Sequence, residues 1–277
     1  MGQIAYVGYA SISYALNKVD NPGDLGYSQI KNMKAIISIF IWVVSGLLTI
    51  LLFLVVFTLT ILLFPFDKKK KITHTQCFWW SDLMVSLNPY WSLKVSGLEN
   101  IDHQKTYVII ANHQSMADIV ALYQTKMQFK WVAKASLFKV PFIGWCLSLI
   151  KHIKLTRGDF SSIKKIYQEA SCWLQKDMSV LFFPEGTRSS SDEMGEFQNG
   201  AFKFAIKEKK PILPICLKGT HAAIPKGSWI FKAKVNAAVI VLPAIETSGF
   251  GSGDFALLRD IVRDKIKTAS KLTYVNK

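Results

Sequence analysis

From residue 93 onward, short apolar runs alternate with longer stretches in which apolar residues recur every three or four positions. Short apolar runs bounded by turn residues are typical of buried strands, and the longer period is typical of helices that bury one face. The expected strands are 93–96, 107–111, 130–133, 153–155, 179–183, 212–217 and 237–242. The expected helices are 116–126, 136–138, 144–149, 161–175, 200–208 and 254–269. This alternation predicts an α/β sheet covered by helices.

A different pattern fills residues 35–66, which carry no charge and are mostly Leu, Ile, Val and Phe. A helix needs about 20 apolar residues to cross a bilayer core, so this run predicts a membrane anchor and not a buried core helix. A helix of this length would extend about 45 Å, more than the apolar slab of about 30 Å. We therefore expect it to tilt, or to kink at Ser45-Gly46 into a helix pair within one leaflet.

Four lysines, residues 68–71, follow Pro65 at the end of the apolar run. Lysines beside an apolar helix favour the cytoplasmic leaflet, so we expect an integral or deeply anchored membrane protein with its soluble part on the cytoplasmic face. In a bacterium this would be the inner membrane. Residues 67–92 are rich in aromatic side chains, which favour the headgroup level, although core packing is an equal alternative. The expected organisation is thus an extension of unknown role (1–34), an anchor (35–66), an interfacial segment (67–92) and a soluble domain (93–277).

The formal charge of +15 predicts an anionic partner. No zinc-ligand spacing, recognition-helix pattern or aromatic RNA-binding motif accompanies the basic residues, so phospholipid and phosphate-bearing substrates are favoured over nucleic acid. The four cysteines have no CxxC spacing. Neither a metal site nor a disulfide framework is therefore expected.

His113 lies in the loop that should follow the strand at 107–111. Ser115 resembles a helix N-cap, and Asp118, three residues later, would complete a capping box. Capping alone is the alternative explanation for Asp118. An acid in the first helical turn also lies within reach of an imidazole at the strand end. Such a pair fixes the tautomer of the histidine and stabilises the imidazolium that forms when it takes a proton.

A second polar loop, residues 183–189, follows the expected strand at 179–183. Because sites in α/β sheets lie beyond the carboxyl ends of strands, the two loops predict one shared pocket. Gly186 allows close backbone approach, Arg188 can bind a phosphate with two nitrogens, and Glu185 can orient a hydroxyl or that arginine. A simple turn followed by a surface arginine is the alternative.

These motifs resemble those of the glycerolipid acyltransferase superfamily. Residues 113–118 match its HxxxxD motif, and residues 183–189 match its FPEGTRS block. Residues 153–157 resemble the intervening block, which ends in a phosphate-binding arginine, and residues 213–215 resemble the fourth block. Four blocks in this order are similar to those of the bacterial 1-acylglycerol-3-phosphate acyltransferases. The family often has a lysine where this sequence has Gln198.

The resemblance implies a mixed, largely parallel sheet and direct acyl transfer without a metal or other cofactor. His113 would be the general base, and Asp118 would hold its tautomer. Arg157 and Arg188 would bind the acceptor phosphate, with Glu185 and Gly186 at the glycerol end. The remaining implied substrate-binding residues are Asn112, Thr187 and Ser189, and those of the acyl-chain region are Leu213, Pro214 and Ile215.

The implied acyl donor is acyl-CoA or acyl carrier protein, and the implied acceptor in the bilayer is lysophosphatidic acid. Glycerol-3-phosphate, another lysophospholipid or an amino-acid lysolipid remain alternative acceptors. A non-catalytic membrane-binding protein with the same fold is a further alternative.

Overall fold

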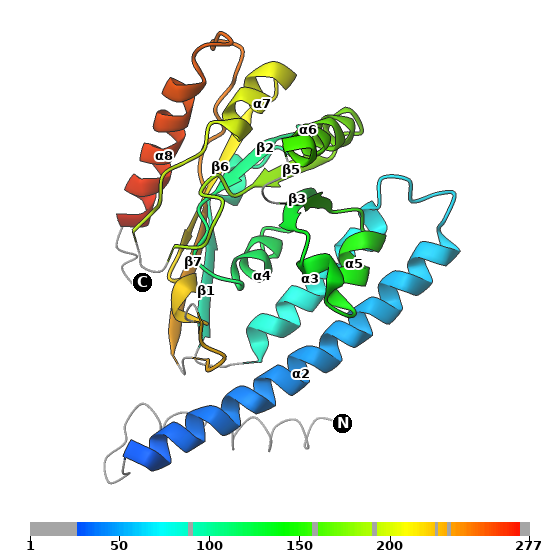
Figure 1. The fold of residues 1–277 in the computed structure, drawn as a ribbon, viewed down its shortest axis with the longest axis vertical. Helices are drawn as coiled ribbons and strands as arrows, with labels where there is room; N and C mark the ends of the chain where they lie inside the picture. Colours follow the sequence, from blue (N-terminus) through cyan, green and yellow to red (C-terminus); the bar gives the residue numbers. More distant parts are fainter. Residues whose placement is uncertain are drawn as a thin grey trace.

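The fold is a three-layer arrangement in which a seven-stranded sheet lies between two groups of helices (Figure 1). The computed structural model describes residues 27–87, 91–156, 160–189, 193–224, 227–231 and 234–271. The strands are β1 (Trp91–Ser96), β2 (Val108–Ala111), β3 (Phe129–Lys134), β4 (Ile153–Leu155), β5 (Ser179–Phe182), β6 (Ile212–Lys218) and β7 (Val235–Val241). They are ordered β1-β7-β6-β2-β5-β3-β4, and only the β6–β7 pair is antiparallel. The predicted mixed, largely parallel sheet is confirmed.

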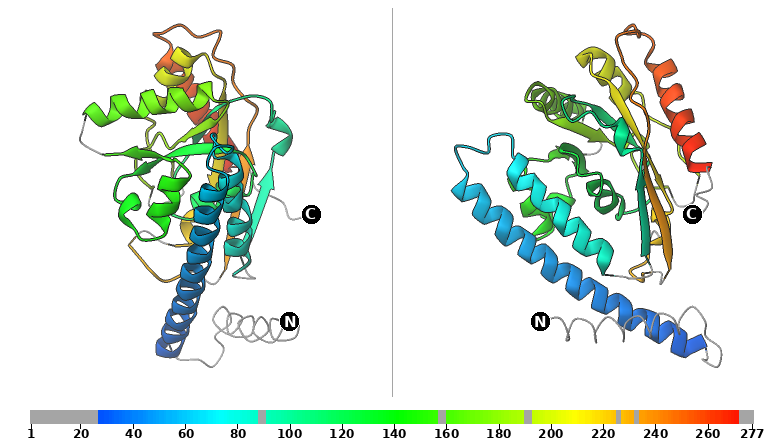
Figure 2. Two further views of the ribbon diagram at one scale, coloured as in Figure 1. Left: turned by 90° about the vertical axis from the view of Figure 1, so that its right-hand side faces the viewer. Right: turned by 180° about the vertical axis from the view of Figure 1, so that it is seen from behind.

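Helices cover both faces of the sheet (Figure 2). The α-helices are α2 (Tyr27–Leu62), α3 (Lys71–Ser86), α4 (Asp118–Tyr123), α5 (Ile143–Leu149), α6 (Phe160–Gln175), α7 (Gly200–Glu208) and α8 (Phe255–Lys271). Short 3-10 turns are η1 (Leu98–Asn100), η2 (Leu137–Lys139) and η3 (Thr220–Ala222). Helices α6, α7 and α8 lie on one face, and α2 to α5 lie on the other (Figure 1).

The short apolar strands follow from this double covering. Val108 and Ile110 of β2 face the core beneath α6, α7 and α8, whereas Ile109 and Ala111 face the core beneath α2 to α5. A strand buried on both faces needs apolar side chains at every position, without the alternation of a half-exposed strand. The unbroken apolar runs in the sequence therefore mark the central strands.

The apolar N-terminal run forms a single long helix that is docked on the domain. Helix α2 begins at Tyr27, earlier than the expected start at residue 35, and continues past Ser45 and Gly46 to Leu62, so the expected kink is not observed. Its residues 31–62 are long and apolar enough to cross a membrane. Leu52 and Val56 nevertheless belong to the core beneath α2 to α5.

The N-terminal half of α2 also contacts the soluble domain. The Trp42 indole donates a hydrogen bond to the Trp229 carbonyl at 2.7 Å, and the Phe231 N–H donates to the Ser38 hydroxyl at 3.0 Å. Further along, the Phe53 ring packs against Trp145 of α5 at 5.3 Å between centroids. Helix α2 is thus held to the domain at several points between Ser38 and Phe53.

The segment expected at the membrane interface contains a packed helix, α3. Phe78 is buried, and the Ser81 hydroxyl donates to the Val120 carbonyl of α4 at 2.6 Å. Two lysines of the run 68–71 also pack against the protein. Lys70 is buried, and Lys69 forms an ion pair with Asp177 at 2.9 Å. Core packing, the alternative for this segment, accounts for Phe78, and two of the four lysines contact protein.

Lys130 is a fully buried lysine beneath α6. Its ammonium donates to the Ile150 carbonyl at 2.7 Å and lies 4.8 Å from the centre of the Trp173 ring. Burial lowers the pKa of Lys130 from 10.5 to about 7. The unfolded chain therefore holds a proton on this amine between about pH 7 and pH 10, where the folded chain has largely lost it.

We expect the free energy of unfolding to rise with pH across that window, because the unfolded state binds more protons than the folded state. Lys130→Met should remove this part of the increase of the unfolding free energy with pH. Chemical unfolding in detergent at pH 7, 8 and 9 measures the slope of the unfolding free energy against pH. The exposed Lys265→Met is the matched control and should keep the wild-type slope. Identical slopes for wild type and Lys130→Met would show that Lys130 stays protonated when folded.

Candidate active site

The two polar loops predicted from the sequence meet at one edge of the sheet. Strands β2 and β5 are parallel neighbours, so the loops 112–117 and 183–189 leave the sheet at the same carboxyl edge. Strand β4 is parallel to β3 and ends at the same edge, but Arg157, the residue predicted beyond it, lies outside the described residues.

His113 and Asp118 form a hydrogen-bonded pair. The Nδ1 atom of His113 lies 2.7 Å from Oδ2 of Asp118. The carboxylate is fully buried, whereas the imidazole is 23% exposed, so the ring can meet a substrate while its partner stays out of water. Because Nδ1 is engaged by Asp118, Nε2 is the nitrogen left to exchange a proton with a substrate.

Backbone amides hold the carboxylate in this position. Oδ2 of Asp118 also accepts from the N–H groups of Gln114 at 2.6 Å and Ser115 at 2.9 Å. The bond to the Ser115 N–H is one half of the predicted capping box, but Ser115 is not the N-cap. Helix α4 begins at Asp118 itself after Ala117, and the Ser115 hydroxyl accepts from the Ala117 N–H at 3.3 Å. The Asp118 N–H donates to the Ser115 carbonyl at 3.3 Å, so a hydrogen-bonded turn precedes the helix and places the acid beside His113.

The loop 183–189 contacts His113 at three points. The Phe183 ring stacks on the imidazole, with centroids 4.2 Å apart and planes inclined by 22°. Oε1 of Glu185 accepts from the His113 N–H at 2.7 Å, and the Ser189 N–H donates to the His113 carbonyl at 2.9 Å. The position of the histidine therefore depends on both loops.

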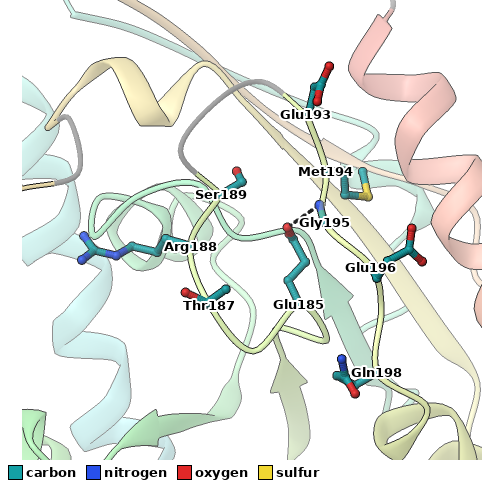
Figure 3. Close-up of a pocket in the computed structure, with 9 residues that line it drawn as sticks. All are labelled: Glu185, Thr187, Arg188, Ser189, Glu193, Met194, Gly195, Glu196 and Gln198. Atoms are coloured by element: carbon teal, nitrogen blue, oxygen red, sulfur yellow. Dashed lines mark hydrogen bonds between the residues drawn. The ribbon is translucent and has the colours of Figure 1, made fainter.

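Glu185 joins a third segment to this arrangement. Its second oxygen, Oε2, accepts from the Gly195 N–H at 2.8 Å (Figure 3). Burial raises the pKa of Glu185, and the two backbone donors oppose this increase. Both carboxylate oxygens are engaged by the protein, so the geometry indicates that Glu185 braces the loops around His113.

A cleft of about 450 Å³ opens beside this brace. The predicted residues Glu185, Thr187, Arg188 and Ser189 line it from one side (Figure 3). The opposite side is formed by residues of the segment 193–198, namely Glu193, Met194, Gly195, Glu196 and Gln198. In Figure 3 the Arg188 side chain extends away from this segment.

Gly186 closes the turn at the start of the loop. Its N–H donates to the Phe183 carbonyl at 3.1 Å, and its backbone has φ +66°, which a residue with a Cβ rarely adopts. The glycine is therefore required by the turn that presents Arg188. A direct contact of Gly186 with a substrate stays a prediction.

The side chain of Asn112, predicted as a substrate contact, is bonded to the protein backbone. Its amide nitrogen donates to the Leu217 carbonyl at 2.8 Å, and its amide oxygen accepts from the Leu217 N–H at 2.8 Å. Both functional groups of the side chain are thus used to fasten the end of β2 to β6. The geometry argues for a positioning role just before His113.

Leu213, Pro214 and Ile215 lie on β6 and are all buried. The side chains of Leu213 and Ile215 face the core beneath α2 to α5, together with Ala111 at the end of β2. This places them on the same face of the sheet as α2, the helix expected to contact lipid. The acyl-chain region stays a prediction.

Three contributions at the site were not expected from the sequence. The stacked ring of Phe183, the Gly195 N–H and the pairing of Asn112 with Leu217 all arise from tertiary contacts. Phe183 belongs to the second motif, so its place in that motif was the only available signal. Among the described residues, no group of three or more His, Cys, Asp or Glu side chains could hold a metal ion.

Comparison with known proteins shows that the sequence around this site is similar to a known family. A family model described as acyltransferase matches residues 92–218. The chloroplastic 1-acyl-sn-glycerol-3-phosphate acyltransferase of Arabidopsis thaliana is 33% identical over 222 residues, which cover 79% of this chain and 62% of the relative. Residues 92–218 form an acyltransferase-family domain.

Other relatives agree with this assignment. The 1-acyl-sn-glycerol-3-phosphate acyltransferase of Pseudomonas aeruginosa is 35% identical over 159 residues, 57% of this chain and 61% of the relative. The crystal structure of the 1-acyl-sn-glycerophosphate (LPA) acyltransferase PlsC from Thermotoga maritima matches with a TM-score of 0.67 and 25% identity, covering 85% of this chain and 100% of that chain. The chain spans 62% and 65% of the length of the two plant relatives. The acyltransferase domain contains His113, Asp118 and the loop 183–189.

Proposed function

We propose that this protein transfers a fatty acyl group from an acyl thioester to the free hydroxyl of 1-acyl-glycerol-3-phosphate, which gives phosphatidic acid. The observation that carries the proposal is the His113–Asp118 pair at the carboxyl edge of the sheet, within the acyltransferase domain. The curated names of the relatives support the choice of acceptor.

His113 acts as the general base in this proposal. Nε2 takes the proton of the acceptor hydroxyl as its oxygen attacks the thioester carbonyl. Asp118, fixed by two backbone N–H groups, keeps the Nδ1 proton in place and stabilises the imidazolium. When the tetrahedral intermediate collapses, the C–S bond breaks and His113 returns the proton to the departing thiolate. The products are the ester and the free thiol, and the base is regenerated.

The charge of the protein suits both substrates. The formal charge of +15 attracts the acceptor phosphate, the phosphates of coenzyme A and the acidic surface of an acyl carrier protein. Arg188 is the described arginine of the loop that contacts His113, and we assign the acceptor phosphate to it together with Arg157. Either thioester carrier is compatible with this assignment.

Helix α2 supplies the proposed contact with the membrane. It is long and apolar enough to insert, and Ile36, Val43, Leu47 and Leu54 are exposed along it. We propose that the acyltransferase domain lies on the cytoplasmic face, where lysines near the end of α2 meet anionic lipid. Lys68 and Lys71 are the exposed lysines of that run.

Acyl transfer by the purified full chain in detergent tests this function. Labelled acyl-CoA and acyl carrier protein thioesters are offered with lysophosphatidic acid, glycerol-3-phosphate, lysophosphatidylcholine and an amino-acid lysolipid. Transfer to lysophosphatidic acid, with phosphatidic acid as product, is expected. Transfer to another acceptor alone would replace the proposed substrate, and absence of transfer to every acceptor would favour a membrane-binding protein.

Arg188→Ala should raise the KM for lysophosphatidic acid by about 10- to 100-fold, the usual value of a charge-assisted hydrogen bond. The KM for the acyl donor should change little. Arg188→Lys should restore binding only in part, because an ammonium cannot reproduce the two-nitrogen contact of a guanidinium. Steady-state kinetics in both substrates measure this, with Arg259→Ala, whose guanidinium pairs with Asp260, as the matched control. An increase confined to the donor KM would move Arg188 to the donor site.

A further inference from the structure

The stacking of Phe183 on His113 has no part in the acid–base scheme above. The two rings are 4.2 Å apart and nearly parallel, and Phe183 is partly buried against the core beneath α2 to α5. Packing against this core restrains the Phe183 side chain. The aromatic ring can therefore serve as a supporting surface for the partly exposed imidazole.

The hydrogen bond to Asp118 alone leaves the imidazole one degree of freedom. A single bond at Nδ1 holds that nitrogen 2.7 Å from Oδ2, but the histidine side chain has two torsion angles, and a coupled change of both can still rotate the ring while this distance is kept. Such a rotation would move Nε2, the atom that meets the substrate hydroxyl. General-base catalysis depends on this atom lying within hydrogen-bond reach of the proton.

We propose that Phe183 is a positioning residue that fixes the ring plane of His113 and stabilises the imidazolium formed during acyl transfer. The inference rests on the proposed function. Stacking blocks rotation toward one side, and the negative face of the phenyl ring attracts the positive charge that develops on the imidazole. The carboxylates of Asp118 and Glu185 also contact His113, and their negative charges likewise favour the imidazolium.

The first test compares Phe183→Leu with Phe183→Tyr. Leucine removes the aromatic face, and we expect kcat to fall by about ten- to a hundredfold while the KM values of both substrates stay within about twofold. Tyrosine keeps the face and should retain most of the wild-type kcat. If the leucine variant does not fold, Phe183→Met, which preserves volume without an aromatic face, takes its place.

Phe182→Leu is the matched control. Phe182 is the last residue of β5 and directly precedes Phe183, but its ring faces the opposite core and packs against Phe204 at 5.7 Å between centroids. This variant should lose thermal stability and keep kcat. A Phe183→Leu variant that raises the acceptor KM with kcat unchanged would contradict the inference, because Phe183 would then act by placing the rest of the loop.

A double-mutant cycle separates action through His113 from a general effect. In a His113→Ala background, Phe183→Leu should lower the residual rate by less than about twofold, because the group it positions is absent. A further loss as large as in the wild-type background would overturn the inference. Absence of transfer by the wild-type protein would instead refute the proposed function, so the two failures are distinct.

Discussion

Replacing His113 by Ala should lower kcat for acyl transfer by about 10²- to 10⁴-fold, the usual contribution of a positioned general base. The KM for lysophosphatidic acid should change little, since the phosphate and the acyl chain are bound elsewhere. The imidazole is partly exposed, so its removal opens no buried cavity, and the thermal midpoint should stay close to that of the wild type. Initial rates with labelled acyl thioester measure the effect.

His103→Ala provides the control for this substitution. His103 lies in an exposed turn between η1 and β2, and its replacement should leave both kcat and thermal stability unchanged. A His113→Ala protein that keeps more than about a tenth of the wild-type kcat would show that another group takes the proton.

Asp118→Asn should be nearly as severe, with kcat lower by about 10²- to 10⁴-fold. If the amide oxygen replaces Oδ2, the bonds to Gln114 and Ser115 survive, but the charge that stabilises the imidazolium is lost. If the amide turns over, its N–H₂ group faces Nδ1 and selects the tautomer with the proton on Nε2. His113 could then no longer accept the substrate proton.

Asp118→Ala separates catalysis from stability. Alanine removes the acceptor of two buried backbone N–H groups, at a cost of about 1–3 kcal/mol each in the free energy of unfolding. Asp118→Asn should therefore unfold near the wild-type temperature, and Asp118→Ala clearly below it. Comparable activity in wild type and Asp118→Asn would mean that Asp118 serves only to start α4.

The sequence predicted the strands well because the sheet is covered on both sides. The central strand β2 is an unbroken apolar run, and the predicted run 179–183 differs from β5 by one residue. The pair of His113 and Asp118 could also be predicted, because both residues lie in one local turn five positions apart.

Contacts between distant segments could not be predicted in this way. Asn112 and Leu217 are separated by 105 positions, and Glu185 and Gly195 by 10. The burial of α3 shows the same limit, since aromatic residues suit a membrane interface and a protein core equally well.

The attachment of α2 has a consequence for how the protein lies on a bilayer. An anchor joined to its domain by a linker lets the domain swivel, whereas α2 is fastened through Trp42 near its middle and through Phe53 towards its C-terminal end. Helix and sheet therefore turn as one body. In the proposed membrane contact, the depth at which α2 settles in lipid would set the height of the carboxyl edge of the sheet, and with it the distance between His113 and the glycerol backbones of the surrounding lipids.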